Sequence, residues 1–152
     1  MSQPFSPMRA LLHALMLVFF AAAANADPGT RVLDERQWVL TTNGHDLPWA
    51  EADQHCRELD LDGHRDWRLP TLTELETLHD PTTDDGVTQP IELDTCCIWS
   101  KTNLAERPAE NGGAPGGDPE NYYWGFLFEG GTGYYSFQRF ADGRALCVRD
   151  VE

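Results

Sequence analysis

Four cysteines are the residues of this sequence with the most distinctive chemistry: Cys56, Cys96, Cys97 and Cys147. In an oxidising compartment such residues form disulfides, and four cysteines allow three pairings among which the sequence alone does not choose. Zinc is the competing interpretation, but the chain has no Cys-x-x-Cys pair and no histidine at ligand spacing from the two adjacent cysteines. Those adjacent cysteines could bond to each other, or one of them could be a small buried apolar side chain. We therefore expect disulfides and no metal.

Aromatic residues near the C-terminus are the second candidate for chemistry. Nine of them lie between residues 122 and 140, and flat rings of this kind can stack on the faces of sugars. Strand alternation puts four of the rings on one face: Tyr122, Trp124, Phe126 and Phe128. That face is more simply interpreted as the side that packs on the core than as a ligand-binding surface. The better surface candidates are Tyr123, Tyr134 and Tyr135. With Trp124, these three form the candidate ligand-binding set.

Acidic residues and histidines give weaker signals. The carboxylates that could ligate calcium are Asp84, Asp85, Glu92 and Asp94, but the tripeptides with which lectins hold calcium are absent, so a solvated acidic surface is the better interpretation. The histidines are scattered, and none belongs to a recognisable pair of nucleophile and base. An enzyme would have to use Cys96 and Cys97. We therefore predict no catalytic residue and no cofactor.

The first 26 residues have the pattern of a signal peptide. A short segment with one positive charge, Arg9, precedes the apolar run from Ala10 to Ala24, which is too short to span a bilayer as a helix. The small residues Ala24 and Ala26 then form the cleavage pattern. We expect an exported protein, periplasmic or secreted, whose residues 27–152 form one domain.

Residues 27–152 are strongly acidic. All 25 Asp and Glu residues and all but one of the 11 Lys and Arg residues of the chain lie there, which leaves a net charge of −15. Such a surface repels nucleic acid and anionic membranes, and no apolar stretch after the leader is long enough to cross a membrane. We therefore expect the partner to be an extracytoplasmic ligand, which the sequence does not identify.

The hydrophobic pattern predicts two helices in the first half of this segment. A strand is expected over residues 37–41, and a helix begins at Pro48, with apolar residues at helical spacing: Trp49, Ala52, Cys56 and Leu59. Thr71 and Glu74 form a capping box at the start of the second helix. Its apolar stripe is Leu72, Leu75 and Leu78, and Asp80-Pro81 ends it.

Strands dominate the second half. They are expected over residues 98–102, 122–128, 134–140 and 145–149, with turns at 129–133 and at Asp142-Gly143. Residues 105–121 are rich in glycine and proline, and we expect a mobile loop there that proteases cut first. The order of elements predicts an α+β fold.

Four sequence blocks together resemble the Lcl C-terminal domain family, also known as domain-of-unknown-function family 1566. The strongest is Asp-Trp-Arg-Leu-Pro-Thr at residues 66–71, followed by Glu74, Leu75 and Leu78. The first helix, from Trp49 to Cys56, is similar to that of the family. Residues 99–102 match its Trp-Ser-Ser-Thr block except at Lys101, and residues 147–149 match its closing block, from which Leu146 departs. The resemblance covers residues 38–150.

The Arg-Leu-Pro-Thr block is also similar to one in the formylglycine-generating-enzyme fold, a relative of C-type-lectin-like domains. That resemblance implies two helices flanking a small, twisted, mainly antiparallel sheet with long loops, and a disulfide between Cys56 and Cys147. The motif residues are expected to be structural, with Arg68 paired to Glu74: Trp67, Arg68, Pro70, Thr71, Glu74 and Trp99.

The expected function is a non-enzymatic binding or adhesion module of the bacterial cell envelope, with a carbohydrate or protein ligand. Sulfated polysaccharides, the known ligands of the adhesin that names the family, are not carried over, because a domain with a charge of −15 would repel them. The alternative is a small redox or metal-dependent enzyme that uses Cys96 and Cys97.

Overall fold

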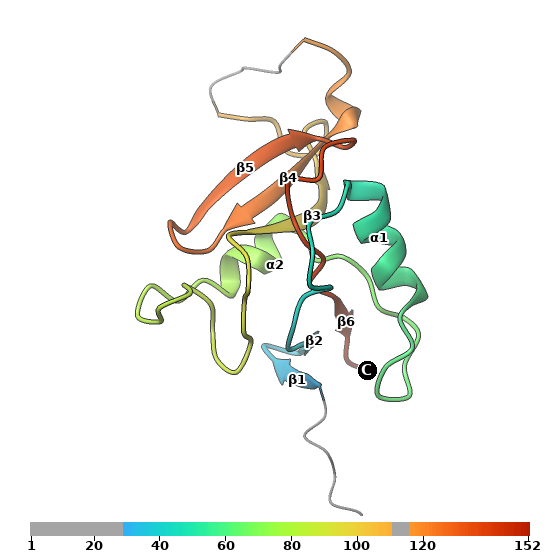
Figure 1. Ribbon diagram of the computed structural model, residues 1–152, viewed down its shortest axis with the longest axis vertical. Helices are drawn as coiled ribbons and strands as arrows, with labels where there is room; N and C mark the ends of the chain where they lie inside the picture. The colour runs from blue at the N-terminus through green and yellow to red at the C-terminus, as the bar shows by residue number, and fades with distance from the viewer. Residues whose placement is uncertain (1–28, 111–115) are drawn as a thin grey trace, which may run out of the picture.

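The computed structural model describes residues 29–110 and 116–152, so the predicted signal peptide lies outside the described residues. Two helices and two antiparallel three-stranded sheets make up the fold, which confirms the α+β prediction (Figure 1). One sheet has the order β1-β2-β6, and the other has the order β3-β4-β5. The elements are β1 Thr30–Leu33, β2 Arg36–Val39, α1 Trp49–Glu58, α2 Leu72–Thr77, β3 Cys97–Asn103, the 3-10 helix η1 Pro119–Asn121, β4 Tyr122–Leu127, β5 Thr132–Phe137 and β6 Val148–Asp150.

The first sheet begins with a hairpin that the sequence pattern did not predict. Strands β1 and β2 are joined at Asp34 and Glu35, both of which have positive φ angles. This is the backbone of a tight hairpin turn, but Asp-Glu lacks the glycine that usually signals one. The strand expected at 37–41 therefore starts and ends earlier, as β2, and pairs on its other side with β6, where Trp38 lies opposite Val148.

The second sheet ends differently from the prediction. The β4–β5 hairpin is present, with β5 starting two residues before the predicted strand. The predicted hairpin at Asp142-Gly143 is wrong, because Gly143 has no positive φ and lies against the rings of Trp99 and Tyr134. After β5 the chain leaves this sheet, and the last strand, shortened to β6, joins the first sheet instead.

Two clusters of buried side chains form the core. One cluster combines side chains of α2 and of both sheets, with Trp38, Leu75, Ile98 and Phe126 among its members. The other packs α1 against the second sheet around Trp99. Phe126 and Phe128 are almost fully buried, as the strand alternation predicted, whereas Tyr122 and Trp124 are only half-buried.

Helix α2 has the capping box that the sequence predicted. The Thr71 side chain accepts a hydrogen bond from the Glu74 N–H, and the Glu74 carboxylate accepts one from the Thr71 N–H. Helix α1 begins after Pro48 without a side-chain cap and buries Ala52 and Cys56. In the predicted loop, residues 119–121 form a short 3-10 helix instead. The mobility prediction falls partly on residues 111–115, outside the described residues.

Candidate functional site

The motif at residues 66–71 contributes to an ion-pair network around the buried Glu74. Arg68 donates two hydrogen bonds to the Glu74 carboxylate, at 2.8 and 2.9 Å, which confirms the predicted pair. Arg36 of β2 donates a third, at 2.7 Å, and Arg68 also contacts Asp150 of β6 at 3.0 Å. One carboxylate thus ties α2 directly to the central strand β2 and, through Arg68, to the edge strand β6.

The pKa of Glu74 records this arrangement. Burial by itself raises the pKa, because it penalises the charged form. The hydrogen bonds from Arg68 and from the Thr71 N–H, with the charges of Arg68 and Arg36, outweigh burial and lower the pKa to about 2. The Glu74 carboxylate is therefore ionised at neutral pH, and it keeps Arg68 and Arg36 in position beside α2.

The other motif residues are buried in the same region. Trp67 and Trp99 are almost fully buried, and each indole N–H donates to a backbone carbonyl, of His64 and Leu47 respectively. Pro70 is fully buried, and its carbonyl accepts a hydrogen bond from the Lys101 N–H. The burial and backbone hydrogen bonds of these side chains are what a structural role requires, and that role stays a prediction.

A disulfide joins Cys56 of α1 to Cys147, just before β6, as the resemblance implied. The two Cα atoms are 5.4 Å apart, and both cysteines are at most 2 % exposed. The bond lies inside the α1 core cluster. It therefore fastens the first helix to the end of the chain.

The candidate aromatic residues do not form one surface. The register of β4 and β5 places Trp124 opposite Tyr135, and Gly125 opposite Tyr134, so the two pairs lie on opposite faces of the sheet. On one face, Tyr123 stacks on Trp49 with ring centroids 3.6 Å apart, and the Tyr134 ring lies over Gly125. On the other face, Trp124 and Tyr135 meet edge to face at 5.4 Å.

The face with Trp124 and Tyr135 forms one wall of an open groove of about 670 Å³. At its rim, Arg107 holds the Glu76 carboxylate with two hydrogen bonds, at 2.9 and 3.2 Å. The Trp124 indole N–H donates to the Arg107 carbonyl at 2.7 Å, which fixes the orientation of the ring. Sequence reasoning missed Glu76 and Arg107, because no spacing rule links residues 31 positions apart.

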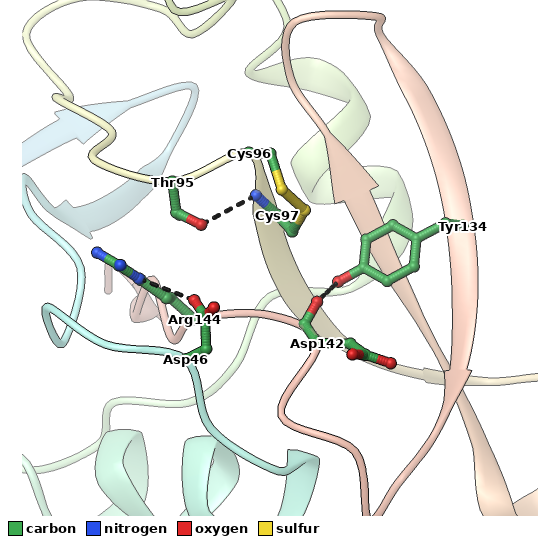
Figure 2. The surroundings of a disulfide bond; sticks show 7 residues. All are labelled: Asp46, Thr95, Cys96, Cys97, Tyr134, Asp142 and Arg144. Carbon is green, nitrogen blue, oxygen red and sulfur yellow. Dashed lines mark hydrogen bonds and ion pairs between the residues drawn. A yellow bond between two sulfur atoms is a disulfide. The ribbon is translucent and has the colours of Figure 1, made fainter.

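The opposite face carries the second disulfide, between the adjacent Cys96 and Cys97 (Figure 2). It borders a cavity of about 480 Å³ that is also lined by Asp46 and Asp142, and by Tyr134 and Tyr135, which line the groove as well. The Tyr134 hydroxyl donates to the Asp142 carbonyl at 2.6 Å. Burial raises the pKa of Tyr134, and the nearby carboxylates add to this effect, so the phenol is neutral.

Arg144 balances part of the acidic charge beside this cavity. It donates to Asp46 at 3.0 Å and to Asp94 at 2.7 Å (Figure 2 shows the first pair). Asp94 is thereby occupied by an arginine instead of standing free for calcium, and Asp85 accepts backbone N–H groups of its own loop. In residues 29–110 and 116–152, no three His, Cys, Asp or Glu side chains gather as a ligand set for a metal ion. Across the same residues, no helix has the length and hydropathy needed to cross a membrane.

Comparison with known proteins agrees with the residue pattern. No curated protein matches the sequence. The family model of the Lcl C-terminal domain matches residues 25–149, a range that contains all four sequence blocks and every described helix and strand except the last residue of β6. The chain belongs to the Lcl C-terminal domain family.

Proposed function

We propose that the protein is a non-enzymatic binding module of the bacterial cell envelope, exported to the periplasm or beyond, and that it binds a carbohydrate. The observation that carries the proposal is the groove beside α2, where Trp124 and Tyr135 lie next to the Arg107–Glu76 pair. The two disulfides are compatible with an extracytoplasmic protein.

The chemistry of the groove suits a sugar. Aromatic rings offer flat apolar surface to the C–H face of a pyranose, and a guanidinium beside a carboxylate offers donors and acceptors to neighbouring hydroxyls. The volume of about 670 Å³ lies in the range that small ligands occupy. Because the Trp124 ring is already fixed by its indole hydrogen bond, little conformational entropy is lost when a ligand stacks on it.

The net charge of the protein restricts which carbohydrates can bind to it. The acidic excess of the chain opposes sulfated and other polyanionic glycans, whose binding depends on Lys and Arg. Neutral or amino-bearing glycans meet no such repulsion. We therefore propose an uncharged or cationic glycan as the ligand.

A glycan array that carries neutral, amino-bearing and sulfated oligosaccharides tests the proposal with purified protein. We expect binding to the first two classes, weakened roughly tenfold by Tyr135→Ala and by Arg107→Ala, because each removes a groove contact. Phe140→Ala is the matched control, since Phe140 is 59 % exposed and lies outside the groove.

Three results contradict this function. The first is binding to sulfated glycans alone, and the second is a glycan affinity that both groove variants leave unchanged. The third is stoichiometric copper or zinc held through Cys96 or Cys97 in the purified protein, which would favour the small redox or metal-dependent enzyme instead.

A further inference from the structure

The two disulfides lie in opposite environments. Cys56 and Cys147 are 0 % and 2 % exposed and are packed inside a core cluster. Cys96 is exposed, Cys97 is half-buried, and both border the open cavity on the Tyr134 face of the second sheet (Figure 2). Because a thiolate must reach a sulfur atom to exchange with it, accessibility separates the two bonds.

The fold also supports the two bonds unequally. Tertiary packing of α1 against the segment before β6 holds Cys56 and Cys147 together across 91 residues, so the folded state itself favours their bond. Cys96 and Cys97 are neighbours in the chain, and their proximity needs no tertiary structure. Opening the Cys96–Cys97 bond therefore leaves the two core clusters joined as before, whereas opening the other bond removes a link between distant elements.

We propose that Cys96–Cys97 is a thiol–disulfide exchange site that accepts electrons from a dithiol, an activity beyond carbohydrate binding and on the opposite face from the groove. One thiolate of the dithiol attacks the sulfur of Cys96, the more exposed residue of the two. The bond to Cys97 breaks, its electron pair goes to the Cys97 sulfur, and that sulfur takes a proton from water. The second thiol of the dithiol loses its proton and attacks the dithiol sulfur that is bonded to Cys96. The bond to Cys96 breaks, and the Cys96 sulfur takes up a proton. Two electrons and two protons reach the protein, and the dithiol becomes a disulfide.

Backbone contacts connect this bond to the rest of the cavity. The Cys97 carbonyl accepts a hydrogen bond from the Arg144 N–H at 2.9 Å, and the Cys96 carbonyl accepts one from the Phe128 N–H at 3.3 Å. The Trp99 N–H donates back to the Arg144 carbonyl at 3.0 Å. Reduction of the Cys96–Cys97 bond should therefore alter the backbone at the start of β3, at the end of β4 and in the segment that contains Arg144.

The charge around the cavity defines the reductant that fits best. Asp46 and Asp142 line it, and Arg144 is already shared between two carboxylates. These anions disfavour the approach of a negatively charged thiol such as glutathione. An uncharged dithiol is the matching class, and dithiothreitol is the probe that represents it.

Site-resolved alkylation of the full folded protein tests the proposal. The protein is treated with low concentrations of dithiothreitol, quenched with iodoacetamide at intervals, and analysed by peptide mass mapping. We expect Cys96 and Cys97 to be labelled roughly tenfold or more faster than Cys56 and Cys147, with circular dichroism unchanged. Amide NMR shifts should change at Phe128 and Arg144 on reduction.

The Cys96→Ser/Cys97→Ser double variant is the control, because it keeps the buried bond and should take up no label under the same conditions. The proposal is overturned if both bonds are reduced together, if the Cys96–Cys97 bond needs denaturant before it reacts, or if Cys96 and Cys97 are labelled without reductant. Since neither Cys96 nor Cys97 lines the groove, failure of this test leaves glycan binding standing, and failure of the glycan array leaves exchange standing.

Discussion

At the scale of the single residue, Glu74 shows how one carboxylate can organise a small fold. Arg68, Arg36 and the Thr71 N–H all donate to it, and they come from two separate segments of the chain, β2 and the motif at residues 66–71. Buried charges are costly unless they are paired and hydrogen-bonded, and here both oxygens are used. The network therefore makes the position of α2 depend on the ionisation of one group.

The pH dependence of stability should reveal that ionisation. The pKa of Glu74 is lowered from 4.5 to about 2 in the folded protein, so its contribution is fully present above pH 4.5 and is lost as the pH falls toward 2. The shift corresponds to roughly 3 kcal/mol. We expect urea unfolding between pH 6 and about 2 to show a steeper loss of unfolding free energy in the natural protein than in Glu74→Gln.

Asp150→Asn, at a side chain 72 % exposed, is the control and should change the curve by less than about 1 kcal/mol. Parallel curves for the natural protein and Glu74→Gln would contradict the assignment.

At the scale of the element, α2 is too short to be stable by itself. It has six residues, whereas isolated helices need more than about a dozen to form in water. The capping box and the packing of Leu72 and Leu75 must therefore supply its stability.

Removal of the cap should show this directly. Thr71→Ala loses the hydroxyl that accepts from the Glu74 N–H, and we expect the free energy of unfolding to fall by about 1 kcal/mol. Thr71→Ser keeps the acceptor and should stay within about 0.5 kcal/mol of the natural protein. Urea denaturation measures both variants, and an equal loss in the two would show that the cap hydrogen bond is not the cause.

The pairing of β4 with β5 requires a glycine at position 125. A β-carbon on Gly125 would overlap the ring of Tyr134, which is held in place by its hydrogen bond to Asp142. We expect Gly125→Ala to destabilise the protein by about 1–3 kcal/mol, because the ring has to move from a packed site. Gly130→Ala is the control, since a β-carbon there would have no neighbour within 4 Å. Equal unfolding midpoints for the two variants would contradict the close approach.

At the scale of the whole molecule, what could be predicted depended on how local the signal was. Helix α2 follows from a capping box within four residues, and β3 follows from its own apolar run. The addition of β6 to β2 could not be predicted, because pairing across more than 100 residues leaves no mark on the short-range pattern. The ligand candidates divide in the same way. Alternation along β4 separated Tyr123 from Trp124, but the groove needed Arg107 and Glu76, which only the tertiary fold brings together.

The Cys56–Cys147 bond spans nearly the same distance along the chain as the β2–β6 pairing, and it lies beside it in the fold. Because the loop it closes has 91 residues, the chain-entropy argument assigns it roughly 4–5 kcal/mol of stability. We expect the Cys56→Ala/Cys147→Ala double variant to lose several kcal/mol in urea unfolding. Cys96→Ser/Cys97→Ser removes a bond between neighbours, which restricts the unfolded chain very little, and should change the free energy of unfolding far less. Similar losses for the two double variants would mean that local packing around each bond, and not the restriction of the unfolded chain, decides what a disulfide contributes here.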